Sequence, residues 1–398
     1  MPTCDPEKFV NREKELAYVK DKITRLVNGQ PFAPYERVVH FVGPSGIGKS
    51  CLLEKCYEIS DIEPGCVPIL IQLDTLIREH EEFSTRFLAT VHEKFCAYKR
   101  ISVEQRGGRT RKQFVSHIYR MINVHGKDQL LVLFLDEINV PDREELQDIE
   151  ENLLEGLMHS NERVVLITAG RAYPMLNNFA LRPSAKNTIL LAAFDENWTG
   201  EQLEKLKPGS AVVAGKVREL GGGVPRNNTK LAEHMVGEPP NIPNELEAVQ
   251  SLLADVKDEI EAVFHPIIEA ICILQHFFPE EAVPLLKNHP ALGKQWDEAR
   301  FKEIFLELKQ VQIGPGALIS WDREQRSWKF DEPTRALFER ELRMRDPKLW
   351  RKLHCAAYEM YKQWGEELNS QLYKGRAEYH QRCLQSAGMN CDDIEKEG

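Results

Sequence analysis

The sequence lacks both an apolar stretch that could cross a membrane and an N-terminal signal segment. A spanning helix needs about 20 consecutive apolar residues, and apolar runs such as residues 130–135 are far shorter. Residues 1–8 do not place a basic segment before an apolar one, which is the arrangement of a secretory signal. We therefore expect a cytoplasmic protein with no membrane partner.

The sequence also lacks the cysteine patterns of a disulfide scaffold or a zinc module. Its nine cysteines are odd in number and scattered, and no CxxC pair occurs. His354 with Cys355, and His380 with Cys383, do not have the spacing of zinc ligands. We expect the cysteines to be reduced thiols that act as small packing residues.

Positive charge is in deficit. Lysine and arginine number 52 against 62 aspartates and glutamates, which gives a formal net charge of −10. This balance argues against a protein whose whole surface coats nucleic acid, but it allows a local basic patch. Residues 98–112 carry six basic side chains and one acid. Because clustered positive charge binds phosphates, this segment is either a nucleic-acid or partner contact or a solvated insertion.

The N-terminal half contains short apolar runs separated by helical patterns. The chain has 398 residues, enough for two or three domains of about 150 residues each. Fully apolar runs are typical of parallel strands covered on both faces, and helical connections between them imply right-handed crossovers. A doubly wound α/β domain is therefore predicted. Its strands are expected at residues 37–42, 67–73, 130–135, 163–168 and 188–194.

One connecting helix is predicted after Pro141, where apolar residues recur at helical spacing. The acidic residues between them, which include Glu150, are expected to form a solvated face. The predicted buried positions are Leu146, Ile149, Leu153, Leu154 and Leu157.

Beyond residue 200 the pattern is mainly helical. Residues 201–236 indicate helices that are interrupted at 221–225. The segment 237–243 indicates a linker, because its prolines cannot continue a helix.

The C-terminal part begins with three helical patterns within residues 266–310, followed by a hairpin within 317–330. This order indicates a winged helix. Two further helices at 349–364 and 366–384 are expected to form an antiparallel pair, which resembles the first unit of a repeat array.

Residues 43–50, Gly-Pro-Ser-Gly-Ile-Gly-Lys-Ser, match the phosphate-loop pattern GxxxxGK[ST] between a predicted strand and a predicted helix. Glycines let such a loop curl so that backbone N–H groups point at phosphate oxygens, and the helix N-terminus adds partial positive charge. Lys49 is expected to reach the β- and γ-phosphates, and Ser50 to bind Mg²⁺. A strand-to-helix turn that matches by chance is the alternative. The predicted nucleotide-binding residues are Gly43, Pro44, Ser45, Gly46, Ile47, Gly48, Lys49, Ser50 and Cys51.

Acidic and basic residues follow two later strands of the predicted sheet. Asp136 and Glu137 end the run at 130–135, where open α/β sheets bind ligands. We expect Asp136 to bind Mg²⁺ with Ser50, and Glu137 to orient or deprotonate the attacking water. Arg171, after the next strand, is expected to neutralise the γ-phosphate, unless it is an ordinary surface arginine.

These motifs, in this order, resemble the STAND class of signal-transducing P-loop ATPases, which is related to AAA+ proteins. The resemblance depends also on residues 9–13 (Phe-Val-Asn-Arg-Glu), 168–171 and 223–225 (Gly-Val-Pro), and it covers about residues 9–345. It implies that the adenine of ATP or ADP lies between an N-terminal box and the Gly-x-Pro proline. The residues implied are Phe9, Val10 and Arg12 on one side and Pro225 on the other.

The resemblance implies a regulatory ATPase, in which slow hydrolysis and nucleotide exchange switch the conformation for signalling or assembly with protein partners or further copies. Asn11 stands where the family usually has glycine, and Asp331 stands near the position of a family histidine, so no nucleotide contact is assigned to it. If the family resemblance is set aside, Phe9 is interpreted as a hydrophobic staple, and residues 223–225 are interpreted as a turn that ends a helix. The implied domains are 1–198 (P-loop ATPase), 199–242 (helical lid), 243–345 (winged helix) and 346–398 (helical hairpin).

Two other functions remain open. An origin-recognition-like or transcription-regulating ATPase would share the Arg-Glu box, the phosphate loop and the winged helix. The acidic balance and the mixed charge of residues 322–329 count against such DNA binding. A nucleotide-binding scaffold with negligible hydrolysis is the third possibility.

Overall fold

The computed structural model describes residues 9–391, apart from 78–81, 103–109, 172, 175, 259, 293–295, 314–315, 323–324 and 389–390. The middle of the basic segment 98–112 lies outside these residues. The chain divides into two compact units, Met1–Ala193 and Phe194–Gly398, which we call the N-terminal and C-terminal units. No helix within the described ranges is both long and apolar enough to span a bilayer.

The N-terminal unit is built on a five-stranded sheet with the order β2-β3-β4-β1-β5. Every pairing in it is parallel, which confirms the predicted α/β fold class. β4 therefore lies between β1 and β3. The strands are β1 (Val38–Val42), β2 (Cys66–Gln72), β3 (Leu130–Asp136), β4 (Val164–Gly170) and β5 (Thr188–Leu190).

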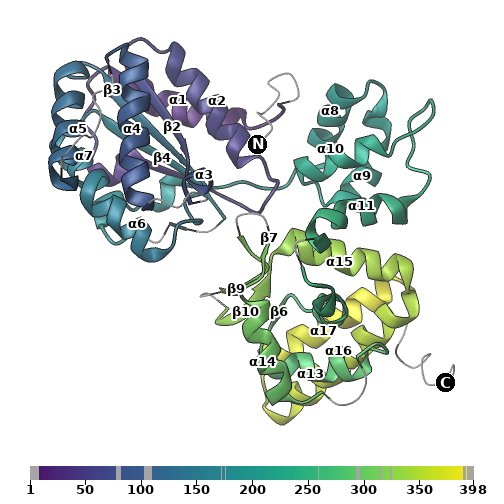
Figure 1. Ribbon diagram of the computed structural model, residues 1–398. Helices are drawn as coiled ribbons and strands as arrows, with labels where there is room; N and C mark the ends of the chain where they lie inside the picture. The colour runs from purple at the N-terminus through teal and green to yellow at the C-terminus, as the bar shows by residue number, and fades with distance from the viewer. Residues whose placement is uncertain are drawn as a thin grey trace. The chain divides into compact units, whose positions relative to one another are not determined.

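Helices cover both faces of this sheet (Figure 1). Strand side chains alternate between two apolar cores, so that Val39 packs with one and Val38 with the other. The first core includes α1 (Glu13–Val27) and α2 (Lys49–Ile62). The second includes α4 (Phe83–Lys99), α5 (Arg111–His125), α6 (Arg143–Ile149) and α7 (Glu155–Ser160). Burial on both faces explains why the strands carry apolar runs without alternation.

The helix predicted after Pro141 contains a deviation that buries one acid. A π-helical turn, Glu150–Leu154, separates α6 from α7. The predicted apolar positions are buried, but Glu150 is buried as well, so the prediction of a solvated Glu150 was wrong. Its carboxylate accepts hydrogen bonds from the backbone N–H groups of Asn177 (2.8 Å) and Asn178. These tertiary partners offset the cost of burying the charge.

The C-terminal unit begins with four helices, and a turn rather than an open linker precedes the last of them. Val236 and Asn241 exchange backbone hydrogen bonds of 2.9 Å each, and Met235 and Ile242 beside them are buried. The segment 237–243 is therefore closed and anchored at both ends. The helices are α8 (Glu196–Leu206), α9 (Ala214–Gly221), α10 (Pro225–Glu233) and α11 (Glu245–Asp258).

The predicted order of three helices and a hairpin comes next along the chain. α12 (His265–Ile271), α13 (Pro279–Asn288) and α14 (Glu298–Leu308) precede the antiparallel pair β9 (Ile319–Asp322) and β10 (Ser327–Phe330). The short strand β6 (His276–Phe277) pairs with the other side of β10. β7 (Gln312–Ile313) and β8 (Gly316–Ala317) form a separate pair.

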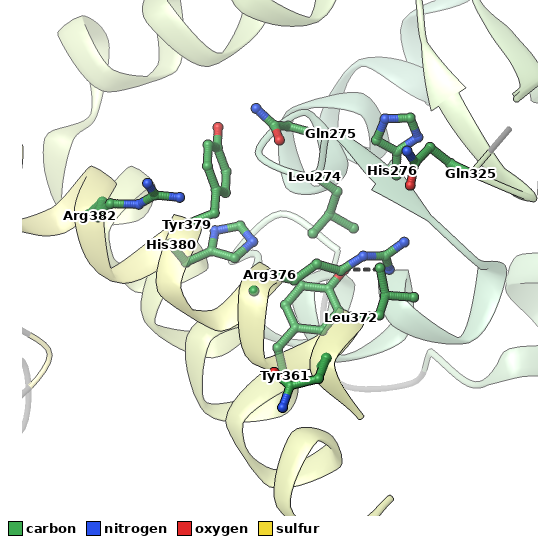
Figure 2. Close-up of a pocket in the computed structure, with 12 residues that line it drawn as sticks. Leu274, Gln275, His276, Gln325, Tyr361, Leu372, Arg376, Tyr379, His380 and Arg382 are labelled. Carbon is green, nitrogen blue, oxygen red and sulfur yellow. Dashed lines mark hydrogen bonds between the residues drawn. The ribbon is translucent and has the colours of Figure 1, made fainter. Parts of the chain in front are cut away.

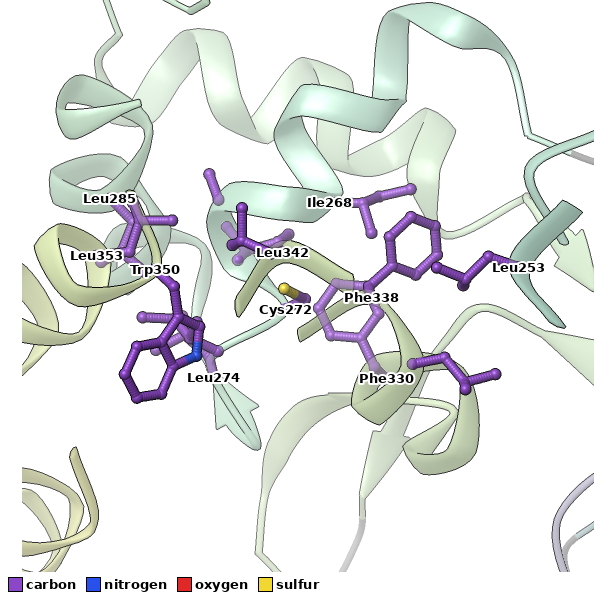
Figure 3. Close-up of a cluster of buried hydrophobic side chains, with 14 of the residues drawn as sticks. Leu253, Ile268, Cys272, Leu274, Leu285, Phe330, Phe338, Leu342, Trp350 and Leu353 are labelled. Atoms are coloured by element: carbon purple, nitrogen blue, oxygen red, sulfur yellow. The ribbon is translucent and has the colours of Figure 1, made fainter. Parts of the chain in front are cut away.

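The last three helices share a core with everything from α8 onward. They are α15 (Glu332–Arg345), α16 (Pro347–Glu367) and α17 (Gln371–Ser386), and α16 packs along α17 as expected. Figure 3 shows the centre of this core, where Leu253, Phe338 and Leu353 come from α11, α15 and α16. The predicted helical lid, winged helix and helical hairpin, with boundaries at 242/243 and 345/346, therefore share one continuous core within a single compact unit.

The cysteines depart from the expectation of reduced thiols at one place. Cys355 of α16 and Cys391 are paired as a disulfide, with their Cα atoms 5.5 Å apart. The packing of α17 along α16 accompanies the approach of Cys391 to Cys355, and no sequence spacing indicates this approach.

We predict that Gly223→Ala destabilises the C-terminal unit. Gly223 has a left-handed φ of +69°, and a Cβ atom there would lie 2.2 Å from the carbonyl oxygen of Phe194. The left-handed conformation alone costs an alanine about 1–2 kcal/mol, and the clash adds to it. Urea denaturation of the nucleotide-free protein should show this loss. The control Gly375→Ala, whose Cβ would meet nothing within 4 Å, should be neutral or stabilising; equal stability of both variants would contradict the prediction.

Candidate nucleotide site

The loop from Gly43 to Gly48 joins β1 to α2 and is tightly curled. Gly46 and Gly48 have left-handed φ angles of 76° and 95°, which favour glycine. A Cβ on Gly43 would lie 3.1 Å from Cγ2 of Ile47 and 3.3 Å from the carbonyl oxygen of Leu191. The motif's glycines are therefore placed where the backbone turns or approaches other atoms closely. Pro44 and Ser45 are half-buried in this loop, and Cys51 lies in the first turn of α2.

Lys49 is buried, and its ammonium group lies against this loop. Its Nζ donates hydrogen bonds to the carbonyl oxygens of Gly43 and Pro44, each 3.0 Å long. The side chain thus holds one positive charge at the loop.

Asp136 is the last residue of β3, and its carboxylate hydrogen bonds with the Ser50 side chain. Burial raises the pKa of Asp136, and the hydrogen bond from Ser50 and the charge of Lys49 offset this only in part. A hydroxyl and a carboxylate in contact form a suitable oxygen donor pair for Mg²⁺, which commonly takes its other ligands from water and phosphate.

Glu137 has an unusual backbone and an orphaned carboxylate oxygen. Its φ is +53°, a left-handed value that is uncommon outside glycine and that recurs at functional sites. Its Oε2 atom is buried and has no hydrogen-bond partner among the described residues. Burial raises the pKa of Glu137, while Lys49 and Arg171 act in the opposite direction. A bound water would satisfy the orphaned oxygen.

Arg171 follows β4 and interacts electrostatically with Glu137. The end of β4 lies close to the loop 43–48, as a hydrogen bond of 3.2 Å from the N–H of Gly43 to the carbonyl oxygen of Gly170 shows. A Cβ on Gly170 would lie 2.0 Å from Oδ1 of Asn139, so a larger residue at this strand end would have to displace the Asn139 side chain. The insertion of β4 between β1 and β3 thus brings Lys49, Asp136, Glu137 and Arg171 together.

Arg12 ties the N-terminal segment 9–13 to the glycine-rich loop. Its guanidinium donates to the carbonyl oxygens of Ile47 (3.2 Å) and Ala192 (2.8 Å). Asn11 and Arg12 have left-handed φ angles of 59° and 82°. Asparagine tolerates this region better than most residues, which explains how Asn11 replaces the glycine that the resemblance expects.

Phe9 and Val10 precede this tie. Val10 is buried, and the half-buried Phe9 packs against the core that contains α1 and α2. Pro225 belongs to the C-terminal unit, where it is the first residue of α10 after the turn at Gly222 and Gly223. The adenine contacts of Phe9, Val10, Arg12 and Pro225 stay predictions.

One acid at this site was missed by the sequence analysis. Asp74 lies in α3 (Leu73–Ile77), directly after β2, and is buried. β2 pairs with β3 so that Gln72 lies opposite Asp136. The charge of Asp74 contributes to raising the pKa of both Asp136 and Glu137. Its position just beyond a predicted parallel strand was the available signal, because such strand ends meet at one edge.

No protein-family model matches this chain, and no curated protein matches it. Among solved structures, Cdc6p from Pyrobaculum aerophilum aligns with a TM-score of 0.49 and 12% identity, over 87% of this chain and 97% of that one. The Aeropyrum pernix ORC1 protein in complex with DNA gives 0.44 and 14%, over 87% and 95%. RuvB from Thermotoga maritima gives 0.43 and 13%, over 81% and 92%.

Proposed function

We propose that this protein is a regulatory ATPase that binds ATP or ADP with Mg²⁺ at the loop 43–48 and hydrolyses ATP slowly. The proposal depends most on one observation. A buried lysine, a hydroxyl–carboxylate pair and a half-buried glutamate with a buried, unsatisfied oxygen surround one glycine-rich loop. A glycine-rich turn that matched the motif by chance would have no reason to gather these groups at the edge of a parallel sheet.

Each residue of the site has its own part in the chemistry. Lys49 and the loop amides bind the β- and γ-phosphates, and Ser50 and Asp136 hold Mg²⁺, which neutralises phosphate charge. Glu137 accepts a proton from water as the water oxygen bonds to the γ-phosphorus. The bond from phosphorus to the β–γ bridging oxygen breaks, and ADP leaves. Arg171 stabilises the charge that develops on the γ-phosphate oxygens.

The switch function is the part of the proposal that the family resemblance supports. In this switch, exchange of ADP for ATP changes the protein's conformation. A ligand shifts a conformational equilibrium only when its affinity differs between the two conformations. The order α12, α13, α14, β9, β10 supports our assignment of a winged helix to this segment. The β9–β10 hairpin does not support the alternative of DNA binding. The positive charge of Lys329 in β10 is already paired with Asp322 of β9, at a distance of 2.8 Å.

The content of the purified protein tests nucleotide binding directly. We expect that acid denaturation followed by ion-exchange chromatography releases ADP in near-equimolar amount. After the nucleotide is removed, calorimetric titration of the protein with Mg–ADP should produce binding heat. Protein that carries no nucleotide and produces no binding heat with Mg–ADP or Mg–ATP would overturn the proposal.

A further inference from the structure

Arg12 holds two backbone carbonyl groups that lie far apart in the sequence. Its Nη2 atom donates to the carbonyl oxygen of Ile47 in the loop 43–48 (3.2 Å) and to that of Ala192 (2.8 Å). The side chain is buried, and burial lowers its pKa, which the charge of Glu15 at 3.6 Å offsets in part. An Nη atom carries two hydrogens, so the two carbonyl groups share one nitrogen. A displacement of either carbonyl group therefore acts on the other.

The first of these carbonyl groups determines the direction of one loop amide. In a trans peptide the C=O and N–H groups point in opposite directions, so the N–H of Gly48 points away from Arg12. Ile47 is buried and Gly48 has a left-handed φ of 95°, which holds this peptide in one orientation. In the proposed function, the N–H of Gly48 is one of the loop amides that bind phosphate. Arg12 therefore fixes the direction of such an amide without touching the phosphate.

The second carbonyl group belongs to the segment 191–194, which joins the two units and which we call the connecting segment. Its first residue is buried, and the N–H of that residue donates to the carbonyl oxygen of Val42 at the end of β1 (2.8 Å). The two alanines that follow are exposed, and the C-terminal unit begins with Phe194. Arg12 therefore holds the connecting segment where it leaves the N-terminal unit, beside the loop that follows Val42.

Phe194 anchors the other end of the connecting segment. Its N–H donates to the carbonyl oxygen of Gly223 (2.8 Å), and its own carbonyl oxygen accepts from Nε of Arg218 (3.3 Å). The Phe194 side chain is buried as well. The segment is thus anchored at both ends, and its two alanines are the exposed part.

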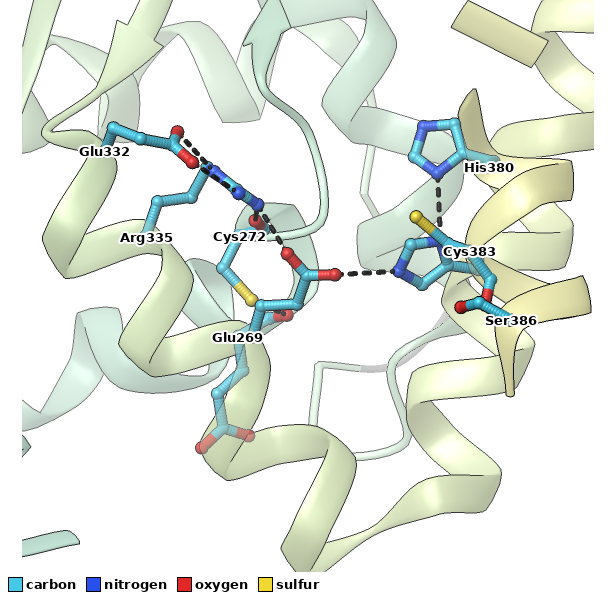
Figure 4. Close-up of polar contacts among 9 residues, drawn as sticks. Glu269, Cys272, Glu332, Arg335, His380, Cys383 and Ser386 are labelled. Carbon is cyan, nitrogen blue, oxygen red and sulfur yellow. Dashed lines mark hydrogen bonds and ion pairs between the residues drawn. The ribbon is translucent and has the colours of Figure 1, made fainter. Parts of the chain in front are cut away.

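The C-terminal unit to which Phe194 is anchored is cross-linked by buried polar contacts. Glu339 of α15 lies 3.3 Å from Nε2 of His354 in α16, and Nδ1 of His354 lies 3.0 Å from Nδ1 of His380 in α17 (Figure 4). Arg376 of α17 pairs with the buried Glu281 of α13, at the edge of a cavity of about 350 Å³ (Figure 2). Because these helices also share one core with α8 and α9, the connecting segment ends on an ordered body.

We propose that Arg12 is a positioning residue that couples nucleotide binding at the loop 43–48 to the order of the connecting segment 191–194. This inference rests on the proposed function. When the connecting segment opens and its hydrogen bonds break, Arg12 loses one of its two carbonyl partners and holds the loop less firmly, so the loop binds nucleotide more weakly. Coupling between two sites is reciprocal, so bound nucleotide stabilises the ordered connecting segment by the same factor.

Hydrogen–deuterium exchange of the connecting segment, with and without saturating Mg–ADP, tests this coupling. The amides of Leu191 and Phe194 are hydrogen-bonded, so they exchange when the segment opens. In the parent protein, Mg–ADP should slow their exchange about fivefold or more, because coupling between two sites is typically about 5- to 150-fold. In Arg12→Gln, whose shorter side chain cannot hold both carbonyl groups, this exchange ratio should fall to about one, and the Kd for Mg–ADP should rise about tenfold.

Arg37→Gln is the matched control. Arg37 is also buried and donates to backbone carbonyl oxygens, among them those of Met158 (2.6 Å) and Asn161 (2.7 Å). It precedes β1, whereas the loop 43–48 follows β1. Its loss should destabilise the N-terminal unit but keep the exchange ratio of the parent protein, which separates coupling from a merely structural role. Arg12→Met, which is apolar and nearly as long as arginine, is the second variant if Arg12→Gln does not fold, and it should show the same low ratio.

Exchange of the connecting segment that does not respond to Mg–ADP in the parent protein would overturn the proposal. Equal exchange ratios in the folded Arg12 variant and in Arg37→Gln would overturn it as well. Titration calorimetry of the parent protein with Mg–ADP distinguishes this failure from failure of the proposed function. If the parent protein binds Mg–ADP and the exchange ratios are equal, only the coupling is wrong. If it binds no nucleotide, the proposed function is wrong, and the coupling is wrong with it.

Discussion

Lys49→Ala is expected to abolish detectable binding of both ATP and ADP. The Lys49 ammonium is held at the loop by the carbonyl oxygens of Gly43 and Pro44, and it is the one basic side chain inside the motif. Hydrogen bonds to charged groups contribute about 1.5–3 kcal/mol each, and ATP would lose this partner at two phosphates and ADP at one. The expected loss in Kd is therefore at least about 100-fold for ATP and at least about tenfold for ADP, measured by titration calorimetry with Mg–ATP and Mg–ADP.

Lys55→Ala is the matched control for this experiment. Lys55 lies farther along the same helix, α2, and pairs with Glu58 at its surface (2.8 Å). Its loss removes the same charge from the protein but none from the loop, so the affinity should be unchanged. If Lys49→Ala retained the affinity of Lys55→Ala for both nucleotides, residues 43–50 would not be the phosphate site.

Glu137→Gln is expected to lower ATP hydrolysis by about 10²- to 10⁴-fold, the usual contribution of a general base. Glutamine has the shape of glutamate but cannot accept the proton, so Mg–ATP should still bind. Single-turnover hydrolysis of radiolabelled ATP and calorimetric titration measure the two effects separately. Glu144→Gln, at an exposed position of α6, is the control and should hydrolyse at the parent rate.

The pH profile adds a second readout for Glu137. A general base works when ionised, so the single-turnover rate should rise with pH through the pKa of this carboxyl. Burial raises that pKa above its ordinary 4.5, which moves the rise to higher pH than an exposed glutamate would produce. Glu137→Gln should lack this rise. If Glu137→Gln hydrolysed ATP at the parent rate with the same pH profile, Glu137 would have no catalytic role, and the scaffold hypothesis would gain support.

The strands illustrate how much of the fold could be predicted from local pattern. The expected run 163–168 corresponds to β4 at Val164–Gly170, and 130–135 corresponds to β3 at Leu130–Asp136. Such runs are readable because a strand buried on both faces needs apolar residues at every position. β5 ends at Leu190 and is shorter than the expected strand at 188–194. The apolar sequence continues past Leu190, but the strand pairing with β1 does not.

The polar residues illustrate the opposite case. The sequence indicates that Glu150 is solvated, but two backbone N–H groups of a distant loop bind its carboxylate. It also contains no sign that Glu339, His354 and His380 form one chain, because α15, α16 and α17 bring them together only when packed. Partners that lie far along the chain leave no local periodicity.

The sequence by itself determined the parallel α/β class, the glycine-rich loop after β1 and the acids at the end of β3, because glycine conformations and buried runs act over a few adjacent residues. Only the tertiary structure decided that Arg12 ties the N-terminal box to the loop, that Asp74 joins Asp136 and Glu137, and that one core unites the chain from α8 to α17. These features depend on the order in which strands and helices pack, and that order is set by the free energy of the whole unit rather than by any one segment.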